Sequence, residues 1–155
     1  MSSRKRRLLF NSANDVREEI EKLQRQDYRK LKNWNLSQIC EHLTKTMQGE
    51  MDGLGFRLPW ILRKTVGSWL TAWVLRTQSM PSVPTLPSLK PIHQLESDND
   101  ETIRKCIDTL QTVEAFDGSL REYPFVDGIT HEQWRQFMWI HAAHHLGFLH
   151  PLSNG

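Results

Sequence analysis

The stretch from Trp134 to Leu149 constrains this chain more than any other part of the sequence. Its large apolar residues recur at spacings of three and four, which predicts one helix with a single stripe facing a core. That stripe comprises Trp134, Phe137, Met138, His141, His145 and Phe148. Two imidazoles therefore interrupt it one helical turn apart. Because side chains at i and i+4 lie next to each other, His141 and His145 have the separation that two ligands of one metal ion need.

Helical periodicity predicts four long helices and one shorter helical segment. The first three long helices are expected from Ala13 to Lys32, from Leu36 to Met51, and from Ser97–Glu101 to Asp117. The last includes the stretch from Trp134 to Leu149, with a cap at Thr130 and a stop at Pro151; the shorter segment runs from Leu58 to Thr77. Four prolines exclude a helix from the connection at 79–95, which we expect to be an extended crossover. Because no alternating strand pattern occurs, the predicted fold is an all-α four-helix bundle with a short extra helix and a long Pro-rich crossover.

The composition suits one globular domain spanning residues 1–155. A net charge of only +2 does not favour nucleic acid as a partner. Basic residues do gather in Arg4-Lys5-Arg6-Arg7, within an N-terminal arm (residues 1–10) that we expect to be solvated and frayed. The two cysteines are predicted to be reduced and buried. With no segment that could span a membrane and no signal-peptide pattern, the expected compartment is the cytoplasm.

The segment from Trp60 to Trp73 is unusually rich in tryptophan and is accompanied by several basic residues. One interpretation is a helix lying on a membrane surface. The other is a helix packed on the bundle or on a partner subunit. We prefer the second interpretation, because the positive charge of the segment is modest.

A third metal ligand is sought among the remaining histidines. His93, His131 and His150 fall in the crossover or at helix ends, whereas His42 lies within a helix at the edge of its apolar stripe. Metal sites in bundles are built from facing helices, so His42 with His141 and His145 would leave coordination positions open. The alternative is that these are hydrogen-bonded core histidines without a metal. His144 also competes with His145, because an i, i+3 pair with His141 reaches the same face.

Two motifs resemble those of the DinB/YfiT-like superfamily of metal-binding four-helix proteins. Trp34-Asn35-Leu36-Ser37-Gln38-Ile39-Cys40-Glu41-His42-Leu43 is similar to its second-helix signature, and His141-Ala142-Ala143-His144-His145-Leu146 to its final-helix signature. Arg6 to Phe10, the Pro-rich crossover and Pro124-Phe125 resemble one branch, which is catalogued as a domain of unknown function. The similarity covers nearly the whole chain.

The resemblance implies up-down-down-up connections and a divalent metal, nickel or zinc, on His42, His141 and His145. His144 is then a neighbour of the ligands. It also implies chemistry with a low-molecular-weight thiol such as bacillithiol, mycothiol or glutathione, an electrophilic substrate, and a homodimer. The branch usually carries a histidine before the proline of the loop that precedes the last helix. Tyr123 stands there in this sequence, so no role of that histidine is carried over.

Two function hypotheses follow. The first is a metal-dependent transferase, or a related hydrolase, in which open metal positions activate a thiol or a water. No general base is named. Glu41 lies about 100° around the helix from His42, which makes it a poor first choice as a base and leaves it a role in supporting a ligand. The second is a non-enzymatic bundle module for dimerisation or partner binding, which the exposed aromatics of the tryptophan-rich segment would favour.

Overall fold

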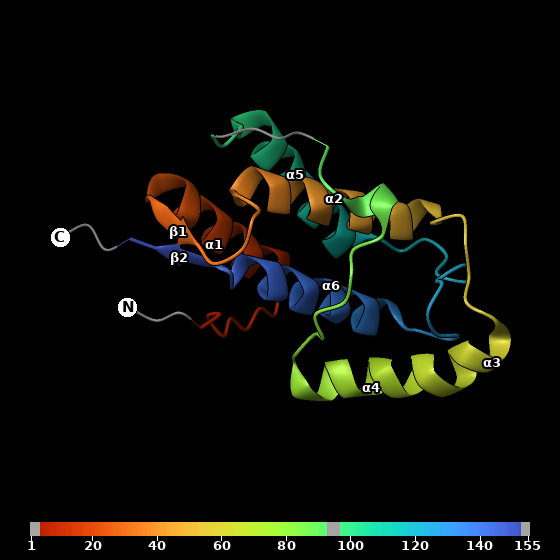
Figure 1. Cartoon of the computed structure of the whole chain (residues 1–155). Coiled ribbons are helices and arrows are strands. Elements are labelled where there is room, and N and C mark those ends of the chain that lie inside the picture. The colour runs from red at the N-terminus through yellow and green to blue at the C-terminus, as the bar shows by residue number, and fades with distance from the viewer. Residues whose placement is uncertain (1–3, 93–96, 153–155) are drawn as a thin grey trace.

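The computed structural model describes residues 4–92 and 97–152, and helices dominate it (Figure 1). The helices are α1 (Ala13–Arg25), α2 (Leu36–Asp52), α3 (Trp60–Leu62), α4 (Ser68–Thr77), α5 (Asp100–Ala115) and α6 (His131–Leu146), with a π-helical turn at Arg63–Gly67 and a 3-10 turn at Pro87–Leu89. The all-α prediction is confirmed except for one small sheet. His93, the end of the crossover, the first three residues of the arm and the expected stop signal at Ser153–Gly155 lie outside the described residues.

Side-chain caps fix where the two histidine-bearing helices begin. The Asn35 side chain accepts a hydrogen bond from the backbone N–H of Gln38, and the Gln38 side chain accepts one from Asn35 in return, both at 2.9 Å. Thr130 and Gln133 form the same reciprocal pair at the start of α6. Each capping box satisfies donors that the first turn of a helix leaves free. The starts of α2 and α6 therefore agree with the prediction from the sequence.

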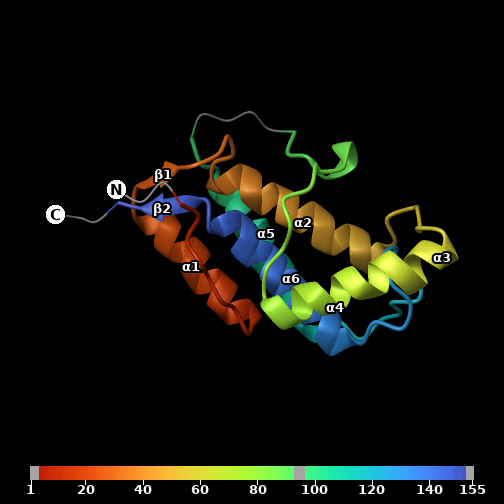
Figure 2. The ribbon, with the colours of Figure 1, turned by 60° about the horizontal axis from the view of Figure 1, so that its bottom comes forward.

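The four longest helices lie side by side around one core (Figure 2). Helix α2 packs against α5 and α6, and α1 packs against the same two helices. Fully buried side chains from each of them fill the space between: Val16, Ile20, Leu36, Leu43, Leu110, Val113, Trp134 and Leu146. Helix α4 packs on the outer side of α6. This arrangement brings α2 and α6, the two carriers of the candidate ligands, into direct contact.

Two short strands replace the ends of two predicted helices. Helix α1 ends at Arg25 and α6 at Leu146, so the predictions that they run to Lys32 and Leu149 are wrong. Strand β1 (Tyr28–Lys30) instead pairs antiparallel with β2 (Leu149–Pro151). Strands of three residues have no periodicity of their own to read, and their stability comes from the pairing itself. The ladder ties the end of α6 to the segment that leads into α2.

The basic arm is ordered where the sequence predicted a frayed terminus. Arg6 forms an ion pair with Glu19 at 2.6 Å and donates to the carbonyl of Leu149 at 2.7 Å. Its backbone N–H also donates to the carbonyl of Gly147 at 2.9 Å. The expectation of a solvated arm is therefore wrong for this part of it, because the end of α6 leaves carbonyl groups free to accept.

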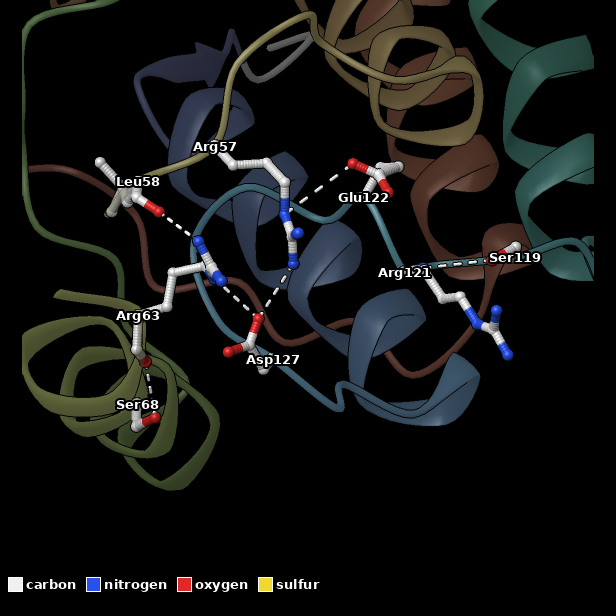
Figure 3. A network of polar contacts seen from close by, with 8 residues as sticks. All are labelled: Arg57, Leu58, Arg63, Ser68, Ser119, Arg121, Glu122 and Asp127. Atoms are coloured by element: carbon white, nitrogen blue, oxygen red, sulfur yellow. Dashed lines mark hydrogen bonds and ion pairs between the residues drawn. The ribbon is translucent and has the colours of Figure 1, made fainter. Parts of the chain in front are cut away.

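The tryptophan-rich segment is anchored by arginines at one end. Arg57 and Arg63 donate to one oxygen of Asp127 at 3.0 and 2.7 Å, and Arg63 also bonds the carbonyl of Leu58 (Figure 3). Trp60 and Trp69 nevertheless remain 61% and 66% exposed. The bulk of the tryptophan surface is thus not buried against the rest of the described chain. Among the described residues, no helix has both the length and the apolar character required to cross a bilayer.

A glycine sets how closely this segment approaches the loop before α6. A Cβ placed on Gly67 would lie 2.0 Å from the carbonyl oxygen of Phe125. We expect Gly67→Ala to lower the free energy of unfolding by about 2 kcal/mol, because backbone has to move to relieve the clash. Denaturant unfolding measures the effect. Gly49→Ala is the control, since its Cβ would meet only the flexible end of Leu54. Equal stability of the two variants would contradict the close approach.

Besides the histidines, the core holds two cysteines and one glutamate, together with buried serine, threonine and asparagine side chains. Cys40 and Cys106 are free and buried, as predicted, and the hydrogen bond between them together with burial raises the pKa of Cys40. Glu50 on α2 is 7% exposed and accepts a hydrogen bond from Trp134 Nε1 at 2.8 Å. Burial raises the pKa of Glu50 to about 7, although the Trp134 hydrogen bond opposes the shift.

Candidate metal centre

Three histidines converge where α2 meets α6. His42 lies in the second turn of α2 and is buried, whereas His141 and His145 lie in the last two turns of α6 and are partly exposed. One ring nitrogen from each of them lies within 4.8 Å of the others. These are the three residues that the sequence pattern and the resemblance single out. A group of this kind can hold a metal ion.

Hydrogen bonds alone do not satisfy both short contacts between these nitrogens. His141 Nε2 lies 3.1 Å from His42 Nε2 and 3.0 Å from His145 Nε2. His42 Nδ1 lies 2.8 Å from the carbonyl oxygen of Leu89, which can only accept, so Nδ1 carries the proton and the neutral ring presents a lone pair at Nε2. His141 Nε2 has at most one proton to donate. At most one of its two short contacts is therefore a linear hydrogen bond.

A shared cation accounts for this spacing better. Two imidazole nitrogens bound to one ion at about 2.1 Å lie about 3.0 to 3.4 Å apart, depending on the angle between the bonds. The two observed separations fall at the lower end of that range. The donor set consists of imidazoles alone, which suits zinc, nickel, copper or iron rather than magnesium or calcium. The residues present thus fit a divalent transition metal.

The surroundings keep the three rings in the form that binds metals. Burial lowers the pKa of His42, and burial followed by the neighbouring histidines lowers those of His141 and His145 well below the ordinary value. Neutral rings offer lone pairs, whereas protonated rings do not. Trp34 stacks on His145, with ring centroids 5.7 Å apart, and contacts His42 at 5.2 Å. An aromatic wall therefore covers one side of the cluster.

A cavity of about 440 Å³ borders this cluster at His145. Its walls come from residues 31–34 before α2, residues 82–85 of the crossover, Ile39, and His144, His145 and Phe148 at the end of α6. His145 belongs to both the cavity wall and the histidine cluster, and Trp34 lines the cavity while contacting the cluster. The exposed part of the His145 side chain thus faces a space large enough for a small molecule.

Comparison with known protein families gives one match, to the family described as "Protein of unknown function (DUF1569)", over residues 2–152. The chain belongs to this family. Neither the curated proteins nor the solved structures that were searched include a match to it. The resemblance to a branch of unknown function is confirmed at the level of this DUF1569 family.

His144, the competing ligand, has a different position in this DUF1569 protein. Its Nδ1 lies 3.0 Å from Lys5 Nζ, and its ring also hydrogen-bonds to the backbone of Met80. The ammonium can only donate, so Nδ1 accepts and the other nitrogen carries the proton. Both nitrogens are engaged away from the cluster. His144 thus connects α6 to the N-terminal arm and to the start of the crossover.

We expect His144→Ala to keep the metal content of the wild type while loosening the arm. Losing both contacts from a buried side chain lowers the free energy of unfolding by about 1–3 kcal/mol. Trypsin should cleave the arm faster in the variant, because Lys5 loses its partner. Element analysis and timed proteolysis measure the two effects. Loss of bound metal from this variant would place His144 among the ligands.

The sequence predicted the roles of some of the other residues around the site and missed others. His131 Nε2 bonds the Gly118 carbonyl and His150 Nε2 bonds the Arg4 carbonyl, so both have only local roles, as expected. Glu41 forms an ion pair with Lys45 at 2.9 Å and accepts a hydrogen bond from the backbone N–H of Ile92. The Leu89 carbonyl was missed, because a backbone acceptor in a loop leaves no signal in the sequence. Phe148 was assigned to the core stripe, and its place beside the cavity was missed.

Proposed function

We propose that this DUF1569 protein is a divalent-metal-dependent enzyme that transfers a low-molecular-weight thiol to an electrophile, or performs a related hydrolysis. The convergence of the Nε2 atoms of His42, His141 and His145 beside a cavity carries the proposal. Nickel and zinc are the metals proposed. When bound, the ion supplies Lewis-acid activation of a thiol or a water.

The chain's own residues would prepare the site for that chemistry. The Leu89 carbonyl fixes the tautomer of His42, so that its Nε2 faces the cluster. Trp34 holds the His145 ring by stacking and excludes water from that side. The cavity beside His145 gives a substrate access from one direction. No carboxylate or further imidazole is assigned as a general base.

The proposal extends to the fold and the setting of the protein. The four long helices are proposed to form the up-down-down-up bundle of the DinB/YfiT-like superfamily, and the contacts among α1, α2, α5 and α6 support this topology. The reduced state of Cys40 and Cys106 suits a reducing compartment, so a cytoplasmic location is proposed. Small molecules and a second copy of the chain are the partners proposed. Nucleic acid and membrane are not.

Two measurements test the enzymatic proposal. Element analysis of protein purified without added metal should find close to one nickel or zinc ion per chain. The loaded protein should then conjugate bacillithiol, mycothiol or glutathione to a chlorodinitrobenzene electrophile, and a chelator should stop the reaction. Full metal occupancy without turnover of any of the three thiols would refute the thiol-transfer proposal. Hydrolysis of ester substrates would then be the activity to assay.

A non-enzymatic role is the second candidate, and one observation favours it. Trp60, Val66 and Trp69 are 61%, 59% and 66% exposed along the segment from α3 to α4. Aromatic residues exposed in this way are enriched at protein interfaces. The candidate is a bundle module that dimerises through this face. Size-exclusion chromatography with light scattering, together with metal analysis, distinguishes the two candidates. A metal-free dimer whose stability does not change when a chelator is added favours the module over the enzyme.

A further inference from the structure

An uncompensated positive charge stands at the rim of the cavity. Lys32 is exposed, and its ammonium lies 4.3 Å from the centroid of the Phe148 ring. Lys5 Nζ, which contacts His144 Nδ1, lies 5.3 Å from the centroid of the same ring. Neither ammonium forms an ion pair with a carboxylate in the part of the chain described. Lysines without a counter-charge next to a cavity favour an anion as its occupant.

The two lysines also act on each other. Burial lowers the pKa of Lys5, and the nearby charge of Lys32 lowers it further. The Phe148 ring holds Lys32 in place through a cation–π contact, which keeps the ammonium at the rim. An anion bound there would relieve the repulsion between the two ammonium groups.

The residues that line the cavity indicate which other chemical groups its ligand carries. The lining residues include no acid, and Lys32 is the one residue among them with a permanent positive charge. Trp34, Val83, Pro84 and Phe148 give apolar surface, while Ser82 and Thr85 add hydroxyl groups. A volume of about 440 Å³ falls within the range for small-molecule sites. The complementary molecule has an apolar body and one negatively charged end.

The number of cations selects the kind of anion. A phosphate dianion is usually bound by several donors, such as arginine forks or a nest of backbone N–H groups. Lys32 is the one lysine that lines the cavity, whose walls are polar and apolar in about equal parts, and a single lysine matches a single carboxylate better. We infer that the cavity binds a small monocarboxylate, with Lys32 pairing its carboxylate group and the aromatic walls receiving its body. The inference names a substrate class for the proposed function, and it rests on that function for turnover but not for binding.

Benzoate and the neutral benzamide form a matched pair of probes. We expect benzoate to bind the metal-loaded protein at least tenfold more tightly than benzamide in a titration followed by NMR. Lys32→Gln should weaken benzoate about tenfold and leave benzamide unchanged, while Lys32→Arg should keep most of the affinity. Lys30→Gln is the control, because Lys30 Nζ points to the Asn33 carbonyl and does not line the cavity. The affinity should also fall as salt rises.

The outcomes separate this inference from the proposed function. Equal binding of benzoate and benzamide, or unchanged benzoate affinity in Lys32→Gln, overturns the inference. Tighter binding of inorganic phosphate than of benzoate overturns the choice of a carboxylate. Benzoate binding that depends on Lys32 in a chain unable to hold nickel or zinc supports the cavity and overturns the metal enzyme. Element analysis of Lys32→Gln should show unchanged metal, which excludes an indirect effect through the histidines.

Discussion

His141→Ala should abolish stoichiometric metal binding. His141 Nε2 is the atom that approaches both other ligand nitrogens, at 3.1 and 3.0 Å, so its loss leaves two imidazoles on different helices. Because mutation of residues that merely support a ligand already weakens metal binding by about 10- to 100-fold, removal of the ligand itself should exceed about 100-fold. Element analysis after dialysis, and titration with nickel and zinc, measure the change.

The same variant should lose its response to chelators. An ion that binds only the folded state raises stability by an amount that grows with its concentration relative to the dissociation constant. A chelator should therefore lower the melting temperature of the wild type and have no effect on His141→Ala. His150→Ala is the matched control, because the His150 ring bonds the Arg4 carbonyl and lies outside the cluster. Retention of one tightly bound ion by His141→Ala would refute the three-histidine centre.

Glu50→Gln should stabilise the protein at neutral and alkaline pH. The folded pKa of Glu50 is raised to about 7 from an ordinary value of 4.5, so the folded state keeps a proton that the unfolded chain releases. The contribution of Glu50 to the free energy of unfolding is therefore largest below about pH 4.5. It falls as the pH rises through 7, by about 3 kcal/mol in total. The amide of glutamine has no charge to bury, and it keeps an oxygen to accept the Trp134 hydrogen bond.

The measurement is the difference in unfolding free energy between variant and wild type, followed from pH 4 to pH 8 by chemical denaturation. Contributions from other titrating groups cancel in that difference. We expect it to grow in favour of the variant by about 2–3 kcal/mol across the range. Glu132→Gln, at an exposed position of α6, should show a change below about 0.5 kcal/mol. A difference that does not vary with pH would mean that Glu50 is ionised in the folded protein.

The sequence predicted best what local signals encode. The Asn35 and Thr130 capping boxes set the start of α2 and α6, and hence the rotation of each helix. Periodicity then placed His42 at an edge that faces the other helix, and the i, i+4 spacing placed His141 and His145 together. The convergence of all three rings was therefore within reach of the sequence. Their role as metal ligands stays a prediction, which the His141 variant tests.

Features that depend on distant pairing could not be predicted in this way. The helix predicted to reach Lys32 gave way to β1, because the partner strand lies at the other end of the chain. The ordered arm depends on carbonyl groups exposed at the end of α6, and one of them accepts from Arg6. Lys32 was missed as a candidate for the same reason. Its loop reaches Phe148 only after the two strands have paired.

The pairing of β1 with β2 has a mechanical consequence for the cavity. The ladder continues on both sides, with Leu31 N–H bonded to the Phe148 carbonyl at 2.9 Å and Leu152 N–H to the Asp27 carbonyl at 2.7 Å. Backbone hydrogen bonds thus connect the wall that carries Lys32 to the wall that carries His145. The opposite wall, at 82–85, is an exposed Pro-containing strap without regular structure. Because this strap lacks regular structure, we expect it to be the wall that moves when the cavity takes up a guest.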